Sequence, residues 1–202
     1  MDGLAAPRLA DLIDESEIRE LTARHGPTPR WQLSVEMSAV TFDYWWKKLV
    51  VKRNRRGEVA LVIQRPDQQV LLHTKDFYPA GIHRLLTGGV FPGESVADSV
   101  RRETMEETGL RVSLERFLGL VTYEFRCQGR SMPFVSYVCL VQADATPPMP
   151  EDQHEQITGF CYVPPTELRR VAAQLRALTG DWAAWGAFRA LPHEMAADAL
   201  GA

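Results

Sequence analysis

The 202-residue sequence has few cysteines, no long apolar run and no excess of basic residues. Its three cysteines, Cys127, Cys139 and Cys161, are odd in number and lack the paired spacing of a metal site. They therefore predict reduced thiols and argue against a disulfide framework. The formal net charge of −3 gives no electrostatic footprint for duplex nucleic acid, which argues against that class of partner.

Signals for export or membrane insertion are also missing. Residues 1–7 show no basic segment followed by an apolar one, and no apolar run reaches membrane-spanning length. We therefore expect a cytoplasmic protein without a membrane partner. With 45% hydrophobic and 24% charged residues and no internal repeat, the chain is typical of one globular domain with extensions.

The most informative stretch runs from residue 88 to residue 110 and reads as a glycine-rich loop, one short helix and a glycine stop. Ser95, with Asp98 three residues later, forms a capping-box pattern that predicts the first turn of the helix. Gly109 followed by Leu110 predicts a left-handed residue that ends it. About three and a half turns lie between these two signals.

Three glutamates gather on this predicted helix. At about 100° per residue, Glu103, Glu106 and Glu107 occupy one arc, and Glu107 falls on the buried side. Neighbouring carboxylates repel one another, and acids in a last turn oppose the helix macrodipole. A hard divalent cation, Mg2+ above all, explains the arrangement because it binds several carboxylate oxygens. A solvated acidic helix face is the alternative.

The full pattern is longer than a cluster of glutamates and reads Gly-x5-Glu-x7-Arg-Glu-x2-Glu-Glu-x-Gly from residue 88. Its seven fixed positions arise by chance in a chain of this length on the order of once in a million. Residues 88–110 resemble the Nudix box of the Nudix hydrolase family. The resemblance implies an α/β/α sandwich with a mixed sheet. It also implies hydrolysis of a nucleoside diphosphate linked to another group, with Mg2+ or Mn2+ as cofactor.

The resemblance assigns roles to individual residues. Glu103, Glu106 and Glu107 match the metal-binding glutamates of the family. Arg102 matches its orienting arginine, and Glu94 matches the acid that holds this arginine. Glu106, Glu107 and Arg102 thereby count as catalytic residues. These residue types suit the reaction, because diphosphate hydrolysis needs neutralised negative charge and an activated water, which metal ions supply.

Two positions depart from the family pattern. Thr104 stands where an aliphatic residue is usual, and we expect its hydroxyl to bond the carbonyl of Val100. Leu86-Thr87-Gly88 stands where many members have Pro-Gly-Gly. If the backbone-carbonyl metal ligand of the family is kept, it comes from Thr87.

Candidate site residues also follow the box. Glu155 closes the polar stretch 151–155, and Nudix enzymes often supply a further metal ligand or general base from such a loop. A solvated loop is the alternative. Tyr123 and Phe125 lie on a predicted strand and are candidates for one wall of the substrate pocket, although strand aromatics are commonly core residues.

Periodicity and turn signals place the remaining elements and divide the chain. An amphipathic helix and an extended arm form the N-terminal part (1–40), followed by a Nudix hydrolase domain (41–180) and a helical extension (181–202). The aromatic stripe from Trp182 to Leu191 predicts packing against the body or against a second subunit in a homodimer. Strands are predicted at 45–51, 58–64, 69–73, 84–87, 114–127, 134–143 and 157–163, and helices at 9–25, 164–180 and from 181.

Three functions from different classes compete. A metal-dependent hydrolase leads, because the carboxylate set is complete. A non-catalytic nucleotide-ligand sensor on the same fold would be favoured by lost glutamates, and none is lost. An isomerase is disfavoured, because isopentenyl diphosphate isomerases share this fold but use a cysteine before the box, and the first cysteine here is Cys127. ADP-ribose-like compounds, nucleotide sugars, dinucleoside polyphosphates and NTPs all remain candidate substrates.

Overall fold

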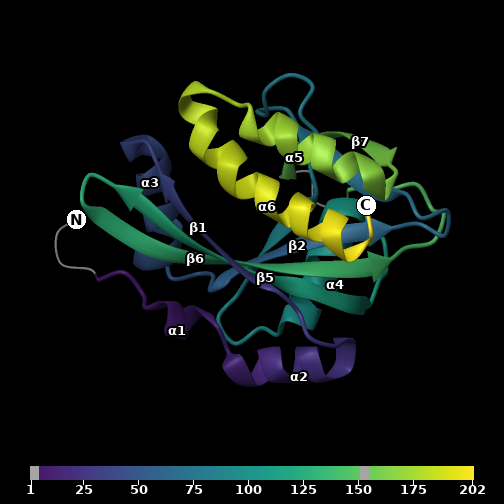
Figure 1. Cartoon of the computed structure of the whole chain (residues 1–202), viewed down its shortest axis with the longest axis horizontal. Coiled ribbons are helices and arrows are strands. Elements are labelled where there is room, and N and C mark those ends of the chain that lie inside the picture. Colours follow the sequence, from purple (N-terminus) through teal and green to yellow (C-terminus); the bar gives the residue numbers. More distant parts are fainter. Residues whose placement is uncertain (1–4, 151–154) are drawn as a thin grey trace.

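A mixed β-sheet forms the middle layer of the computed structural model, which describes residues 5–150 and 155–202 (Figure 1). Two pairs of neighbouring strands are parallel and the others are antiparallel. The strands within the described residues are β1 (Arg30–Glu36), β2 (Gly57–Gln64), β3 (Val70–Lys75), β4 (Leu86–Val90), β5 (Leu114–Cys127), β6 (Arg130–Gln142) and β7 (Ile157–Val163). Their order is β1-β5-β6-β2-β3-β7, and β4 pairs with β2 beside this path.

Helices cover both faces of this sheet (Figure 1). One face carries α1 (Leu9–Leu12), α2 (Glu15–His25) and α4 (Val96–Thr108). The opposite face carries α3 (Ala39–Trp46), which continues as a π-helix (Lys47–Val51), together with α5 (Leu168–Arg176) and α6 (Ala183–Ala199). Short 3-10 turns at Pro165–Glu167 and Gly180–Trp182 precede α5 and α6. The α/β/α sandwich with a mixed sheet is confirmed.

Alternation along β2 shows how the sheet joins two cores. Val59, Leu61 and Ile63 point into the core under α2 and α4, whereas Ala60 and Val62 point into the core under α5 and α6. All five side chains are fully buried. A strand covered on both faces needs a continuous apolar run, which β2 provides.

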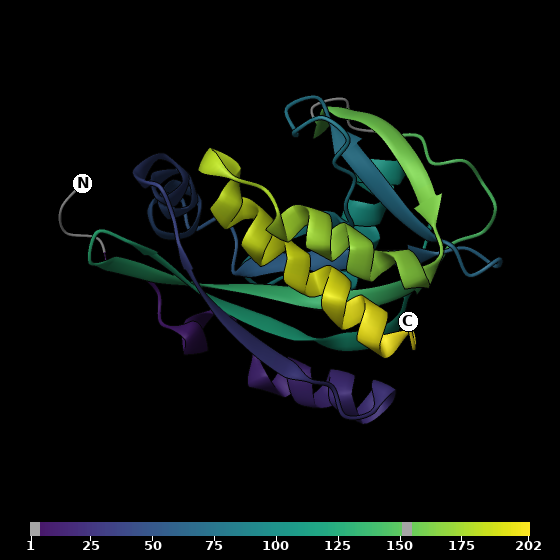
Figure 2. The same cartoon turned by 45° about the horizontal axis from the view of Figure 1, so that its top comes forward.

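The sheet forks at β2, and this fork positions the functional cleft. β4 pairs with the first part of β2, at 57–61, whereas β3 meets β2 only where Gln64 pairs with Val70. Figure 2 shows the paired β3 and β7 diverging from the remaining strands. A single bridge between His73 and Arg84 still ties the two branches together. Residues from both branches therefore face one another across a gap.

The strand predicted at 45–51 is wrong, because this segment forms α3 and the π-helix. Aromatic and β-branched residues favoured a strand, but apolar side chains recur here at helical spacing, including Phe42, Trp45 and Leu49, and all are buried. Ser38 caps the start by accepting a hydrogen bond from the Thr41 amide (3.3 Å). Packing against α6 and the sheet thus decided the helical state.

Other boundaries shift by less. The extended arm predicted within residues 1–40 contains β1, which pairs in parallel with β5. The N-terminal helix is interrupted before Asp14, whose side chain caps α2. The strand predicted at 84–87 begins two residues later, whereas the predicted 114–127 and 157–163 are confirmed as β5 and β7.

The C-terminal extension contributes directly to the core. Phe188 and Leu191 of α6 are buried, so the predicted packing of the aromatic stripe against the body is confirmed for these two residues. Between residues 5 and 150 and after residue 154, the chain forms no helix whose length and apolar character suit a membrane crossing.

Candidate active site

The box helix α4 has the boundaries that its sequence predicts. The Ser95 hydroxyl accepts a hydrogen bond from the Asp98 amide (3.0 Å), which fixes the first turn. Gly109 ends the helix in the left-handed region at φ 68°, and Leu110 packs into the core behind it. The glutamates of the last two turns are thereby held in a fixed relation to the preceding loop.

Gly88 brings the backbone of β4 against the Glu103 side chain. A Cβ atom on Gly88 would lie 1.9 Å from Cγ and Cδ of Glu103, so only glycine admits this contact. Glu103 is buried in consequence. Burial raises the pKa of its carboxyl above the ordinary value, although Arg102 pulls this pKa downward.

Gly88→Ala is expected to fold and to lose about 100-fold in turnover, because the added methyl group displaces the Glu103 carboxylate. Steady-state kinetics and a thermal melt measure the two effects. Gly159→Ala is the matched control, since its Cβ meets only Thr74 Cγ2 at an ordinary 3.5 Å. Wild-type turnover in the Gly88 variant would contradict the importance of this contact.

Arg102 joins the carboxylates of the box into one network. Its guanidinium donates to both oxygens of Glu94 (2.8 and 2.9 Å), to Glu103 (2.6 Å) and to Glu106 (3.2 Å). It also donates to the Gly89 carbonyl (2.7 Å). Partial burial by itself raises the pKa of Glu94, but the bonds from Arg102 and from a loop amide outweigh it and lower this pKa to about 2. Glu94 therefore holds Arg102 as a carboxylate.

A second cluster surrounds Glu107, one turn further along α4. The Lys75 ammonium, at the end of β3, lies 3.1 Å from Glu107 Oε1 and 2.5 Å from Glu155 Oε2. Burial is the main cause that raises the pKa of Glu107 to about 8, against the opposing effect of Lys75. Burial also lowers the pKa of Lys75, but the two carboxylates outweigh it and raise this pKa above its ordinary value. Glu155 is thus brought to the box, although it lies 48 positions beyond Glu107 in the sequence.

The donor set fits a hard divalent cation. The described residues hold no preassembled group of three acidic, cysteine or histidine ligands, because the glutamates are turned toward Arg102 and Lys75. Glu107 Oε2, however, is buried and has no hydrogen-bond partner among these residues. An unpaired buried carboxylate oxygen is costly, and a cation would offset this cost. Glu103, Glu106 and Glu107 are the residues that would hold it.

A cleft of about 720 Å³ opens in front of the two clusters. Glu103 and Glu155 lie on its wall, together with the backbone of Thr87 to Gly89. Trp182 and Trp185, which precede and begin α6, supply an aromatic wall that continues through Tyr78. The volume lies in the usual range for a small-molecule site.

Basic side chains also line this cleft. Lys48, Arg55 and Arg84 face it, and none of the three forms a salt bridge with another described residue. Arg84 is almost completely buried and instead donates to Tyr78 Oη, the Leu85 carbonyl and Thr87 Oγ1. Cations that lack a carboxylate partner attract anionic groups into the cleft.

Two residues of α6 form hydrogen bonds to β2 and to the segment before β4, beside the cleft. Arg189 pairs with the buried Glu58 of β2 (2.5 Å), and His193 Nε2 accepts from the Leu85 amide (2.9 Å). Burial lowers the pKa of His193 to about 3, so the imidazole is neutral and able to accept. No local pattern in the sequence indicates these pairs or the role of Lys75, because their partners lie far away in the chain.

Tyr123 and Phe125 do not form a pocket wall and are core residues. Both are buried under α6, where the Tyr123 hydroxyl donates to the Phe188 carbonyl (3.1 Å) and Phe125 packs on Phe188. Their side chains face α6 rather than the cleft. The alternative that the sequence left open, burial in the core, is therefore the one found.

Thr104 also differs from expectation. Its hydroxyl is buried without a hydrogen-bond partner among the described residues, so the predicted bond to Val100 is absent there. The Thr104 carbonyl, by contrast, accepts a hydrogen bond from Thr108 Oγ1 in the next turn (2.5 Å). Residues 151–154, which precede Glu155 in the polar stretch, lie outside the described residues.

Comparison with known proteins agrees with this architecture of a sandwich, a glycine loop and a carboxylate-bearing helix. The family model of the NUDIX domain matches residues 53–185. That match covers more than half of the chain. The chain therefore belongs to the NUDIX family of hydrolases.

Individual relatives match over smaller parts or at lower similarity. A stretch of 70 residues is 43% identical to Nudix hydrolase 19, chloroplastic, of Arabidopsis thaliana and covers 35% of this chain and 16% of that protein. A NUDIX-family hydrolase from Clostridium perfringens is 17% identical, with a TM-score of 0.48 over 73% of this chain and 99% of that one. An Ap4A hydrolase from C. elegans is 16% identical, with a TM-score of 0.48 over 72% and 97%.

Proposed function

We propose that the protein is a divalent-metal-dependent hydrolase that cleaves the diphosphate bond of a nucleoside diphosphate linked to another group. The observation that carries the proposal is the buried carboxylate cluster beside the cleft, with Glu107 at its centre. A buried acid with one unpaired oxygen is costly to keep, and binding a cation for catalysis accounts for it. The alternative is a non-catalytic sensor of nucleotide ligands on the same fold.

The proposed chemistry divides between the metal and the side chains. Mg2+ or Mn2+, when bound, supplies positive charge to the phosphate oxygens and acidifies a water. Glu103, Glu106 and Glu107 hold the ion, with the Thr87 carbonyl as a further candidate ligand. Arg102 keeps Glu103 and Glu106 in place through its hydrogen bonds.

Glu155 is the proposed general base. It accepts the proton of the attacking water while the water oxygen bonds to phosphorus and the bridging P–O bond breaks, which leaves two phosphate monoesters. Lys75 lies 2.5 Å from Glu155, and its hydrogen bond lowers the pKa of Glu155 although burial alone would raise it. The carboxylate form that a base requires is thereby favoured.

Glu155→Gln is expected to lower kcat at least tenfold, because the amide cannot take up a proton. Single-turnover kinetics at saturating Mg2+ measure the chemical step directly. Glu124→Gln is the control, since the partners of Glu124 are the exposed Arg126 of β5 and the exposed Ser34 of β1, far from the box. An unchanged kcat in the Glu155 variant would show that Glu155 is a solvated loop carboxylate and not the base.

The cleft supports an anionic substrate with a planar group. Lys48 and Arg55 offer positive charge for phosphates, and Trp182 and Trp185 offer flat surfaces for a base. ADP-ribose-like compounds, nucleotide sugars, dinucleoside polyphosphates and NTPs all combine these features.

The proposed function is tested with a panel of these four compound classes, with Mg2+ and with EDTA. We expect release of a nucleoside monophosphate from at least one class with Mg2+ and none with EDTA. Nucleotide binding without turnover across the panel would instead favour the sensor.

The proposed setting follows from the sequence alone. Reduced cysteines and a net charge of −3 lead us to propose a cytoplasmic enzyme without duplex nucleic acid or a membrane as partner. A homodimer stays a prediction. The aromatic stripe that suggested the dimer packs against other parts of the same chain. Phe188 and Leu191 enter the core, and Trp182 and Trp185 line the cleft.

A further inference from the structure

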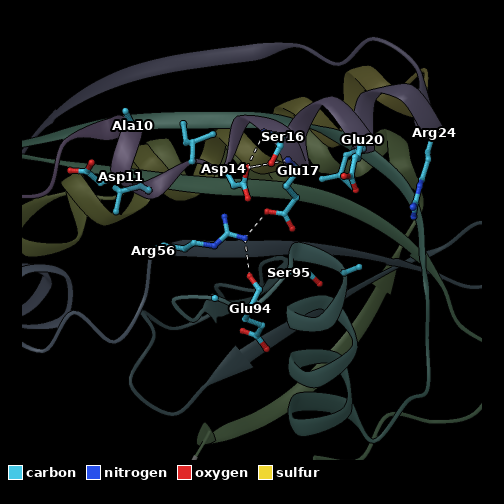
Figure 3. A pocket seen from close by; sticks show the side chains of 15 residues that line it. Ala10, Asp11, Asp14, Ser16, Glu17, Glu20, Arg24, Arg56, Glu94 and Ser95 are labelled. Carbon is cyan, nitrogen blue, oxygen red and sulfur yellow. Dashed lines mark hydrogen bonds and ion pairs between the residues drawn. The ribbon is translucent and has the colours of Figure 1, made fainter.

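Glu17 of α2 reaches the start of the box helix from the N-terminal part of the chain. Figure 3 shows its carboxylate between α2 and the box loop, beside a pocket of about 650 Å³. Glu17 Oε1 accepts a hydrogen bond from the Val96 amide (2.5 Å), and Oε2 pairs with Arg56 (2.6 Å). Val96 is the first residue of α4, so Glu17 satisfies an amide that the helix itself leaves unpaired. Its negative charge also complements the helix macrodipole.

Arg56 connects Glu17 to the box loop and to the sheet. The same nitrogen that pairs with Glu17 donates to the Glu94 carbonyl (2.9 Å), as Figure 3 shows. The other terminal nitrogen donates to Tyr137 Oη (2.7 Å), and the Tyr137 hydroxyl donates to the Leu12 carbonyl (3.0 Å). The Glu17 and Arg56 side chains are only 16% and 12% exposed, so solvent screens this pair weakly.

These contacts continue to the carboxylates of the active site without a break. Arg56 fixes the backbone of Glu94, and the Glu94 side chain fixes Arg102 through two hydrogen bonds. Arg102 in turn holds Glu103 and Glu106. Replacing a residue that hydrogen-bonds to a metal ligand commonly lowers the affinity for the metal by about 10- to 100-fold.

We propose that Glu17 and Arg56 are positioning residues that clamp the box loop and thereby set the affinity of the glutamates for the divalent ion. The inference rests on the proposed metal-dependent function. Glu17 lies outside the region 53–185 that the family model matches, so the N-terminal segment adds this clamp to the domain. Glu17 of α2 is therefore assigned a role in the active site, beyond the covering of the sheet by its helix.

The test compares Glu17→Gln and Glu17→Ala in the full-length protein by calorimetric titration with Mn2+. Glutamine keeps an acceptor for the Val96 amide but loses the charge toward Arg56, whereas alanine loses both. We expect Mn2+ affinity to fall by about threefold for glutamine and about tenfold for alanine. Turnover at saturating Mn2+ is expected to recover in both variants, because the ligands themselves remain.

Glu15→Gln is the matched control on the same helix. Glu15 pairs with Arg30 across the surface, about half exposed, and does not touch the box, so its loss leaves Mn2+ affinity unchanged. Hydrogen exchange of the Val96 amide provides a readout that does not depend on metal or turnover. We expect this amide to lose protection in Glu17→Ala and to keep it in Glu15→Gln.

The possible outcomes separate this inference from the proposed function. A wild type that binds Mn2+, together with Glu17 variants that melt earlier but bind Mn2+ equally well, would make the clamp a purely structural contact and overturn the inference. Unchanged exchange at Val96 in Glu17→Ala would overturn it as well. A wild type that binds no Mn2+ would refute the proposed metal dependence itself, and the inference with it.

Discussion

Glu107→Gln is expected to lower turnover by about 1000-fold or more while the protein remains folded. The substitution removes the one carboxylate that is fully buried at the centre of the cluster. Losing a charged ligand weakens the binding of the cation and reduces the stabilisation of negative charge on the phosphate. Together these two effects supply on the order of several kcal/mol of catalysis. Metal-dependent product release in steady state measures the effect. Glu124→Gln serves as the control, because Glu124 is a partly exposed glutamate on β5.

The same variant is expected to unfold in EDTA at the same temperature as wild type or at a higher one. Glutamine has the shape of the neutral acid, which burial favours because it raises the pKa of Glu107 to about 8. Where Glu107 is ionised, the substitution also removes repulsion from Glu103 and Glu155 and an unfavourable charge in the last turn of α4. A variant in EDTA that unfolds clearly below wild type would contradict this account of the cluster.

Arg102→Ala is expected to lower the stability to unfolding by about 3 kcal/mol and turnover by about 100-fold. Arg102 makes five hydrogen bonds, four of them to carboxylate oxygens, so its loss leaves three acids without their cation. Arg102→Lys keeps the charge but loses the planar fork, and we expect it to lie between alanine and wild type in both properties. Urea unfolding and steady-state kinetics measure them.

Arg101→Ala is the control for the arginine series. Arg101 is the neighbouring residue on α4, about half exposed, and its partner is the exposed Asp98, so the expected loss of stability is below about 1 kcal/mol with unchanged turnover. An Arg102→Lys variant with wild-type activity and stability would show that positive charge alone suffices at this position. The forked geometry would then have no catalytic role.

The box was predictable because its signals are local. The cap at Ser95, the stop at Gly109 and the burial of Glu107 all follow from hydrogen bonds and periodicity within a single helix. Local signals misled where two of them competed. In α3 the aromatic and β-branched composition favoured a strand, whereas the helical spacing of Phe42 and Trp45 fitted the packing against α6.

The sequence by itself determined the family, the mixed sheet, the acidic box and the residue types that a divalent cation requires. Tertiary structure alone decided that Lys75 joins Glu107 to Glu155, that Glu17 caps α4, and that α6 buries Tyr123 and exposes a tryptophan wall to the cleft. The reason is separation along the chain. Contacts between residues dozens of positions apart depend on how the sheet forks and which helices cover it, and no local pattern records that choice.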